Sequence, residues 1–143
     1  MDIEGIRQRI PLRYPYLMID RILEEGDECV VALKNVTINE PFFLGHFPEP
    51  LEAVMPGTLI LEAMAQTAGF IPVPGGSAGP AIGYLVGVEK ARFRRKVVPG
   101  DQLRLEAKVV RRKRELLQAE VRATVEGELA ASAIVSLLLP QTR

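Results

Sequence analysis

Apolar and polar positions along the chain divide it into strand-like runs around one long helical segment. Short apolar runs bounded by Gly, Pro, Asp and Glu are typical of strands. They predict six strands, at residues 17–25, 29–36, 81–93, 102–112, 116–125 and 128–139. Gly26-Asp27-Glu28 predicts a hairpin between the first two strands, and Pro99-Gly100-Asp101 and Glu126-Gly127 predict two further turns. A short helix is expected at residues 3–9, and loops at residues 39–56 and 71–80.

The long helix is predicted between Pro56 and Phe70, with Pro at its start and Gly69 near its end. A helix that packs on one face of a sheet normally keeps a polar face. Here apolar side chains lie on every side of the helix axis, so the helix must be enclosed. We therefore expect an α+β fold, in which a long central helix is wrapped by a curved antiparallel sheet of about six strands. Residues 1–143 are expected to form a single domain.

Composition excludes several classes of protein. The chain has 18 basic and 18 acidic residues, so no global charge favours nucleic acid or a membrane surface as a partner. Cys29 is the one cysteine, which fits a reducing, cytoplasmic compartment. The N-terminus lacks the apolar core of a signal peptide, and no apolar run approaches the ~20 residues that span a bilayer. One histidine and one cysteine cannot build the usual zinc site, so we expect no metal.

Glu62 interrupts the apolar helix and is the first candidate for chemistry. A capping box does not explain it, because Thr58 lies four residues before Glu62 and that motif needs a spacing of three. Burial would raise the pKa of a carboxyl, and a carboxyl kept neutral suits a general acid. Gln66 follows four residues later on the same face and is expected to orient Glu62 by a hydrogen bond. A structural and a functional role both remain open.

His46 lies in the loop before the helix, beside Phe47. A lone histidine in an apolar setting is commonly structural. The functional alternative comes from Gly57 and Thr58 at the helix start, where free N–H groups and the helix dipole favour negative charge. Such a terminus suits a thioester carbonyl and the enolate formed when its α-proton is removed. A base, an oxyanion donor and an acid in one stretch therefore predict elimination of water.

Four segments then carry a resemblance to the 3-hydroxyacyl-[acyl-carrier-protein] dehydratases of type II fatty acid synthesis. They are IPLRYPYLMIDRI (10–22), NVTINEPFFLGHFP (35–48), MPGTLILEAMAQ (55–66) and GVEKARFRRKVVPGDQL (87–103). The resemblance implies a hot-dog fold and, in fatty acid biosynthesis, dehydration of a (3R)-3-hydroxyacyl chain to the trans-2-enoyl product, without isomerisation. It makes His46 the base and Glu62 the acid that protonates the departing hydroxyl or orients water for it, with the Gly57 N–H holding the thioester carbonyl. No cofactor is implied.

The resemblance also implies that each site forms across a dimer interface, with the histidine and the glutamate from different subunits. Dimers of this family commonly assemble as trimers of dimers. Thr58, Phe47 and Gln66 join Gly57 in the expected substrate-binding set. Tyr84 joins it as a gate of the acyl tunnel, although an ordinary strand tyrosine is the alternative.

Two departures from the family pattern stand out. Leu12 occupies a position where the family usually has histidine, which is expected to alter packing and not activity. The stretch between His46 and Pro56 carries two extra residues and places Glu52 near the site.

Ten basic residues gather in residues 92–114. A solvated face or a guarded strand edge is one interpretation. The other is a docking surface for the acidic acyl carrier protein, formed by Arg92, Arg94 and Arg95. The run at residues 111–114 is expected to mark a hairpin turn. Nucleic acid is a weaker interpretation, because no aromatic residues are interleaved with these charges.

The expected activity is therefore that of a hydro-lyase acting on carrier-bound chains, with two rivals. An acyl thioesterase on the same fold would hydrolyse the thioester with a carboxylate and water and would not need His46. A non-catalytic acyl-thioester binder would keep the tunnel without needing His46 and Glu62 together.

Overall fold

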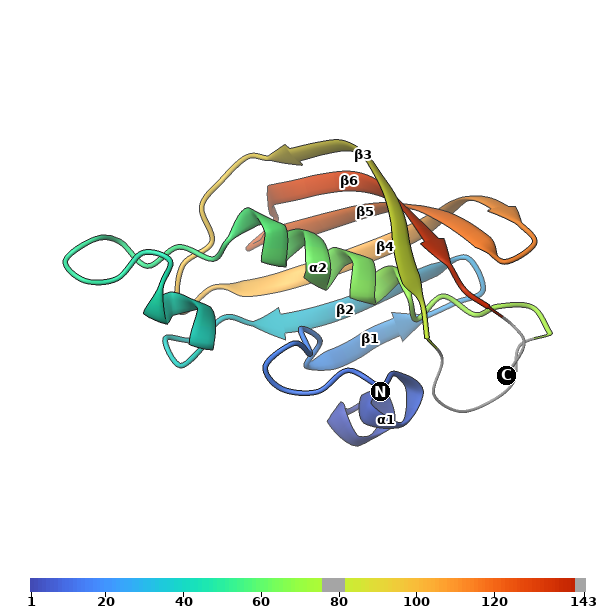
Figure 1. The fold of residues 1–143 in the computed structure, drawn as a ribbon, viewed down its shortest axis with the longest axis horizontal. Coiled ribbons are helices and arrows are strands. Elements are labelled where there is room, and N and C mark those ends of the chain that lie inside the picture. The colour runs from blue at the N-terminus through green and yellow to red at the C-terminus, as the bar shows by residue number, and fades with distance from the viewer. Residues whose placement is uncertain (76–81, 141–143) are drawn as a thin grey trace.

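Six antiparallel strands form one curved sheet around a central helix (Figure 1). The computed structural model describes residues 1–75 and 82–140. Along the sheet the strand order is β1-β2-β4-β5-β6-β3, so β1 and β3 are its two edges. The elements are α1 (Ile3–Arg9), β1 (Arg21–Glu25), β2 (Cys29–Asn35), the 3₁₀ helix η1 (Pro41–Leu44), α2 (Gly57–Ala68), β3 (Tyr84–Phe93), β4 (Gln102–Lys113), β5 (Leu116–Val125) and β6 (Glu128–Leu138). The expected α+β architecture is confirmed.

Small side chains on the inner face of the sheet let α2 lie in its concave side (Figure 1). Along β5 every second residue is buried, which is the two-residue period of a strand with one face on the core. Alanines occupy many of these inward positions on β4, β5 and β6, so the helix axis can approach the strands closely: they are Ala107, Ala119, Ala123, Ala131 and Ala133. Ala63, Met64 and Ala68 of α2 are fully buried against them.

The predicted first strand is wrong at its beginning. It was expected from residue 17, but β1 starts at Arg21. Met18 and Ile19 are both buried although they are consecutive, so they do not alternate as strand residues would. The backbone N–H of Met18 donates to the Gln66 side chain and not to a neighbouring strand. The predicted strand at 81–93 begins at Tyr84, and residue 81 and the second half of the 71–80 loop lie outside the described residues.

The predicted hairpin turns are present. Gly26 N–H donates to the carbonyl of Cys29 between β1 and β2. Glu126 and Gly127 adopt φ angles of 48° and 81° between β5 and β6, as the two-residue turns favoured in hairpins require. Arg114, with a φ of 59°, lies in the turn between β4 and β5, so the basic run at 111–114 does end a hairpin strand.

The helix α2 is less enclosed than its sequence predicts. Thr58 is exposed at its start and Glu62 is half-buried, although the residues from Ala63 to Ala68 are all buried. Within residues 1–75 and 82–140, no helix is long and apolar enough to cross a membrane.

Candidate active site

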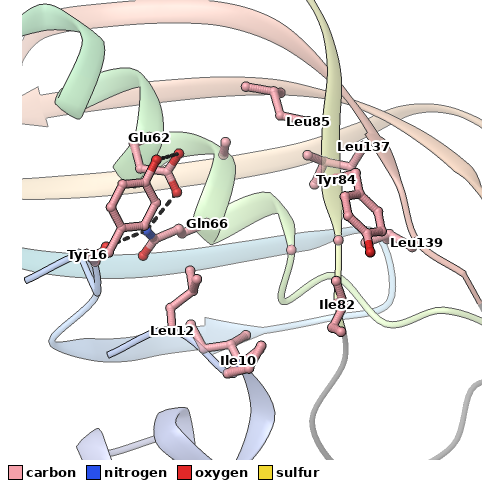
Figure 2. Close-up of a pocket in the computed structure, with 14 residues that line it drawn as sticks. Ile10, Leu12, Tyr16, Glu62, Gln66, Ile82, Tyr84, Leu85, Leu137 and Leu139 are labelled. Atoms are coloured by element: carbon pink, nitrogen blue, oxygen red, sulfur yellow. Dashed lines mark hydrogen bonds between the residues drawn. The ribbon is translucent and has the colours of Figure 1, made fainter. Parts of the chain in front are cut away.

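A cavity of about 340 Å³ lies along the C-terminal half of α2 (Figure 2). Its walls are mostly apolar and come from three places: the segment after α1, the beginning of β3 and the end of β6. Leu12, Tyr84 and Leu139 represent these three walls. Glu62 and Gln66 of α2, with Tyr16, bring the polar groups into the cavity. A mostly apolar pocket with a few convergent polar groups is the usual form of a small-molecule site.

Both oxygens of the Glu62 carboxylate accept a hydrogen bond. Gln66 Nε2 donates to Glu62 Oε2 over 2.8 Å, and the Tyr16 hydroxyl donates to Glu62 Oε1 over 3.3 Å (Figure 2). The predicted hydrogen bond between Gln66 and Glu62, one helical turn apart, is therefore present.

Gln66 is buried, and its amide uses three hydrogen bonds. Its Nε2 also donates to the Tyr16 carbonyl over 2.8 Å, while its Oε1 accepts from the Met18 N–H over 2.8 Å. A reversed amide would turn its NH₂ group towards the Met18 N–H and its oxygen towards the Tyr16 carbonyl and Glu62, so this network fixes the orientation of the amide. Gln66 thus ties the segment at residues 16–18 to α2 beside Glu62.

The charge of Glu62 acts on its tyrosine neighbour. The pKa of the Tyr16 phenol is raised above its ordinary value, first by the negative charge of Glu62, then by burial and by the hydrogen bond between them. Tyr16 therefore stays protonated and remains a donor to Glu62 throughout the neutral pH range.

His46 belongs to the loop that follows η1. Its Nδ1 lies 2.8 Å from the carbonyl oxygen of Val54, and a carbonyl only accepts. In a neutral imidazole this contact assigns the proton to Nδ1 and leaves the Nε2 lone pair available as a base. The ring is half-buried and stacks on Phe47, with centroids 4.1 Å apart.

A buried ion pair anchors the start of η1. Lys34 Nζ lies 3.1 Å from Glu40 Oε2, and these side chains are 6% and 16% exposed. Glu40 directly precedes η1, and the His46 N–H donates to the carbonyl of Phe42 within it. The loop carrying His46 is therefore fixed to β2 at this one end.

The helix α2 begins at Gly57 after Pro56, without a hydrogen bond from a capping side chain. A methyl group added at Gly57 would lie 3.2 Å from the ring of Phe93 at the end of β3. Gly57 thus permits close packing of this ring, in addition to the free approach to the helix start expected from the sequence. Thr58 is exposed beside it.

The structure brings together only part of the predicted site. Glu62, Gln66 and Tyr84 line the cavity, whereas His46, Phe47, Gly57 and Thr58 do not. The loop after η1 leads into the beginning of α2 (Figure 1). The cavity instead lies along the second half of that helix. Tyr16 was missed by the sequence reasoning, because no spacing rule connects residues 46 positions apart.

The three predicted docking arginines also separate. Arg92 and Arg94 line a hollow of about 480 Å³ over β3, β5 and β6, together with Lys90, Arg122 and Glu120. Arg95 instead contacts two carboxylates, Glu128 at 3.1 Å and Asp101 at 3.6 Å. Among residues 1–75 and 82–140, no group of three or more His, Cys, Asp and Glu residues is arranged to hold a metal ion.

A central helix wrapped by a curved antiparallel sheet defines a hot-dog-fold protein, and here a mostly apolar cavity lies along that helix. The dehydratase heterocomplex ApeI:P from Xenorhabdus doucetiae shares the fold, with a TM-score of 0.79 at 15% identity over 94% of this chain and 90% of that one. A hypothetical thioesterase with coenzyme A from Streptococcus pneumoniae TIGR4 gives a TM-score of 0.65 at 16% identity, over 86% and 87% of the two chains.

Sequence comparison narrows this class. A FabA-like domain matches residues 10–134. The 3-hydroxyacyl-[acyl-carrier-protein] dehydratase FabZ of Streptococcus pneumoniae serotype 19F is 46% identical over 139 residues, 97% of this chain and 98% of that protein. The FabZ of Streptococcus gordonii is 46% identical over 141 residues, 99% of each chain. The chain therefore belongs to the FabA-like domain family and, within it, to the 3-hydroxyacyl-[acyl-carrier-protein] dehydratases.

Proposed function

We propose that this protein dehydrates (3R)-3-hydroxyacyl-[acyl-carrier-protein] to the trans-2-enoyl thioester in fatty acid biosynthesis. Near full-length identity of 46% to dehydratases supports the reaction. The observation that carries the proposal is the mostly apolar cavity that the Glu62 carboxylate helps to line. An acyl chain fits the apolar walls, and the carboxylate lies where its 3-hydroxyl group would enter.

In the proposed mechanism, His46 Nε2 takes the proton from C2 of the substrate, because Nδ1 is engaged by Val54. The thioester carbonyl becomes an enolate, whose oxygen is stabilised by the Gly57 N–H at the start of α2. The C3–O bond then breaks while the C2–C3 double bond forms. Glu62, in its protonated form, gives a proton to the departing hydroxyl, or orients a water molecule that relays to it the proton held by His46. The products are water and the enoyl thioester.

We also propose that a second copy of the chain completes each site. The edge strand β3 exposes five apolar side chains, at Tyr84, Leu85, Val86, Val88 and Phe93. Antiparallel pairing of two β3 strands about a two-fold axis would set the Tyr84 end of one strand beside the Phe93 end of the other. Tyr84 borders the cavity, and Phe93 packs on Gly57. Such a dimer would carry His46 of the partner subunit towards Glu62.

The acyl carrier protein is the proposed macromolecular partner. Lys90, Arg92, Arg94 and Arg122 gather at one hollow on the outer face of the sheet, with Glu120 as the one acidic residue in its lining. We propose that this hollow receives the acidic carrier and that Arg95, held by Glu128 and Asp101, contributes less. Arg94→Glu should raise the KM for the carrier-linked substrate more than Arg95→Gln. Equal KM values in these two variants would contradict this surface.

We also propose that residues 1–143 form one domain, that the protein is cytoplasmic, and that its dimers assemble into trimers of dimers. Light scattering of the purified protein tests the assembly, where a mass of two chains would contradict the hexamer. Cell fractionation tests the location, and a single cooperative unfolding transition is expected for one domain.

One experiment separates the dehydratase from its two rivals. The protein is incubated with a 3-hydroxyacyl thioester of the carrier protein, and enoyl formation and thiol release are followed together. Enoyl product without free thiol is expected. Thiol release without enoyl product would establish the thioesterase instead, and the absence of both products would favour the non-catalytic binder.

A further inference from the structure

Among residues 1–75 and 82–140, Tyr16 is the one hydrogen-bond partner of Glu62 from outside α2. Its hydroxyl donates to Glu62 Oε1, while the other oxygen of that carboxylate is engaged by Gln66. Tyr16 also lines the same cavity as Glu62 (Figure 2). The hydroxyl is therefore placed to restrict how the carboxylate turns towards a ligand.

The position of Tyr16 is fixed by two sets of backbone hydrogen bonds. The N–H groups of Tyr16 and Leu17 donate to the Arg13 carbonyl over 2.8 and 3.2 Å, which closes a turn. On its other side, the Tyr16 carbonyl accepts from Gln66, and Met18 N–H donates to the same amide. The ring thus stands on a held backbone, although half of the residue is exposed to solvent.

The contact between the two side chains is long. A distance of 3.3 Å exceeds the usual O–H···O separation of about 2.7–2.8 Å. Catalytic hydrogen bonds in unliganded sites are often long and shorten when the substrate binds. The contribution to turnover is therefore expected in the ligand-bound state, with little effect on folding.

We propose that Tyr16 is a positioning residue, whose hydroxyl holds the Glu62 carboxylate in the orientation that acts on the departing group of the substrate. This inference rests on the proposed dehydratase function. Since Tyr16 acts through Glu62, its loss should lower kcat more than it changes KM.

The direct test compares Tyr16→Phe with Tyr14→Phe in the full-length protein. Tyr14 lies two residues earlier, is 72% exposed and makes no hydrogen bond through its hydroxyl within the described residues. Tyr16→Phe should lower kcat about tenfold with KM changed less than about twofold. Tyr14→Phe should keep both constants. Wild-type kcat in Tyr16→Phe, or equal losses in both variants, would overturn the proposal.

A second measurement reports the contact without relying on turnover. The chain has three tyrosines and no tryptophan, so ultraviolet absorbance follows phenol ionisation cleanly. The part of the absorbance change that is absent from Tyr16→Phe belongs to Tyr16. Glu62→Gln removes the charge that raises the pKa of Tyr16, so in Glu62→Gln this part should appear at lower pH. The exposed Glu126→Gln is the control and should leave the titration unchanged. If Tyr16 ionises at the same pH in Glu62→Gln as in the wild type, the contact between the two side chains is overturned.

These two measurements also separate this inference from the proposed function. If wild-type protein forms no enoyl product, the dehydratase function fails, and the catalytic role of Tyr16 fails with it. If wild-type protein is active and only the Tyr16→Phe result is absent, the positioning role fails alone.

Discussion

The carboxylate and the imidazole assigned to the chemistry are held in opposite ways. Glu62 receives hydrogen bonds from Tyr16 and from Gln66, and Gln66 is buried and linked to a distant part of the chain. The His46 side chain has its hydrogen bond within its own loop, at Val54, and stacks on the adjacent Phe47. That loop is exposed from residue 47 to residue 52.

This difference indicates how the site is divided. The hydrogen bonds of Glu62 are formed within one chain, because the segment at residues 16–18 and α2 meet beside it. His46 has a fixed tautomer, and within the described part of the chain the contacts of its ring are those with the Val54 carbonyl and Phe47. A base presented on a loop and an acid set in a cavity suit a site formed by two copies, each supplying one half.

The largest effect on turnover is expected when either the base, His46, or the acid, Glu62, is replaced. His46→Ala and Glu62→Gln should each lower kcat by about 10²–10⁴-fold, as expected for acid–base residues. Steady-state kinetics on the carrier-linked substrate measures the loss, and thermal unfolding checks that both variants fold. Turnover within a few-fold of wild type in either variant would remove that residue from the mechanism.

The next largest effect is a loss of stability, expected when the ion pair between Lys34 and Glu40 at the start of η1 is broken. Lys34→Met would leave the Glu40 carboxylate buried without its cation and should lower the free energy of unfolding by about 3 kcal/mol. Denaturant unfolding measures it. The double variant Lys34→Met/Glu40→Leu is the control, and it should recover most of the loss because no buried charge remains unpaired. An unchanged single variant would show that the ion pair does not hold the loop.

A smaller loss of stability is expected at Gln66, the residue that supports Glu62. Gln66→Leu would leave the Met18 N–H and the Tyr16 carbonyl without partners, which should lower the free energy of unfolding by about 2 kcal/mol. Gln118→Leu is the matched control, since Gln118 makes one long hydrogen bond, 3.4 Å to Ser136. Equal losses in the two variants would contradict the special position of Gln66.

The smallest effect on stability is expected in the stretch between His46 and Pro56, which carries the two extra residues. Glu52 pairs with Lys96 at 2.6 Å, but both side chains are more than half exposed. Exposed ion pairs contribute little, so Glu52→Ala should change the free energy of unfolding by less than about 0.5 kcal/mol. A loss of several kcal/mol would mean that the two extra residues brace the His46 loop.

Much of the fold could be predicted from residue patterns. The apolar run at residues 116–125 predicted β5 with its observed bounds, and Glu126-Gly127 predicted the turn that follows it. The beginning of β1 could not be predicted, because the Met18 N–H is taken by a side chain 48 residues away. Local pattern rules contain no information about such a partner.

In the candidate site, too, a contact within one helix could be predicted, whereas contacts between distant segments could not. A spacing of four residues on a helix predicted the hydrogen bond between Gln66 and Glu62, which is present. Their roles in catalysis and binding stay predictions. Tyr16 escaped because its contact with Glu62 depends on how the segment after α1 packs on α2. The separation of His46 from the cavity likewise follows from the path of the loop and not from its composition.

The central claim is that each site combines His46 of one subunit with Glu62 of another, and mixing the two inactive variants tests it most directly. His46→Ala and Glu62→Gln chains are unfolded together, refolded as a mixture and assayed for enoyl formation. A shared site predicts recovery of up to about a quarter of wild-type activity, because half of the dimers are mixed and each has one intact site. Activity no greater than that of the separate variants would contradict a site formed between subunits.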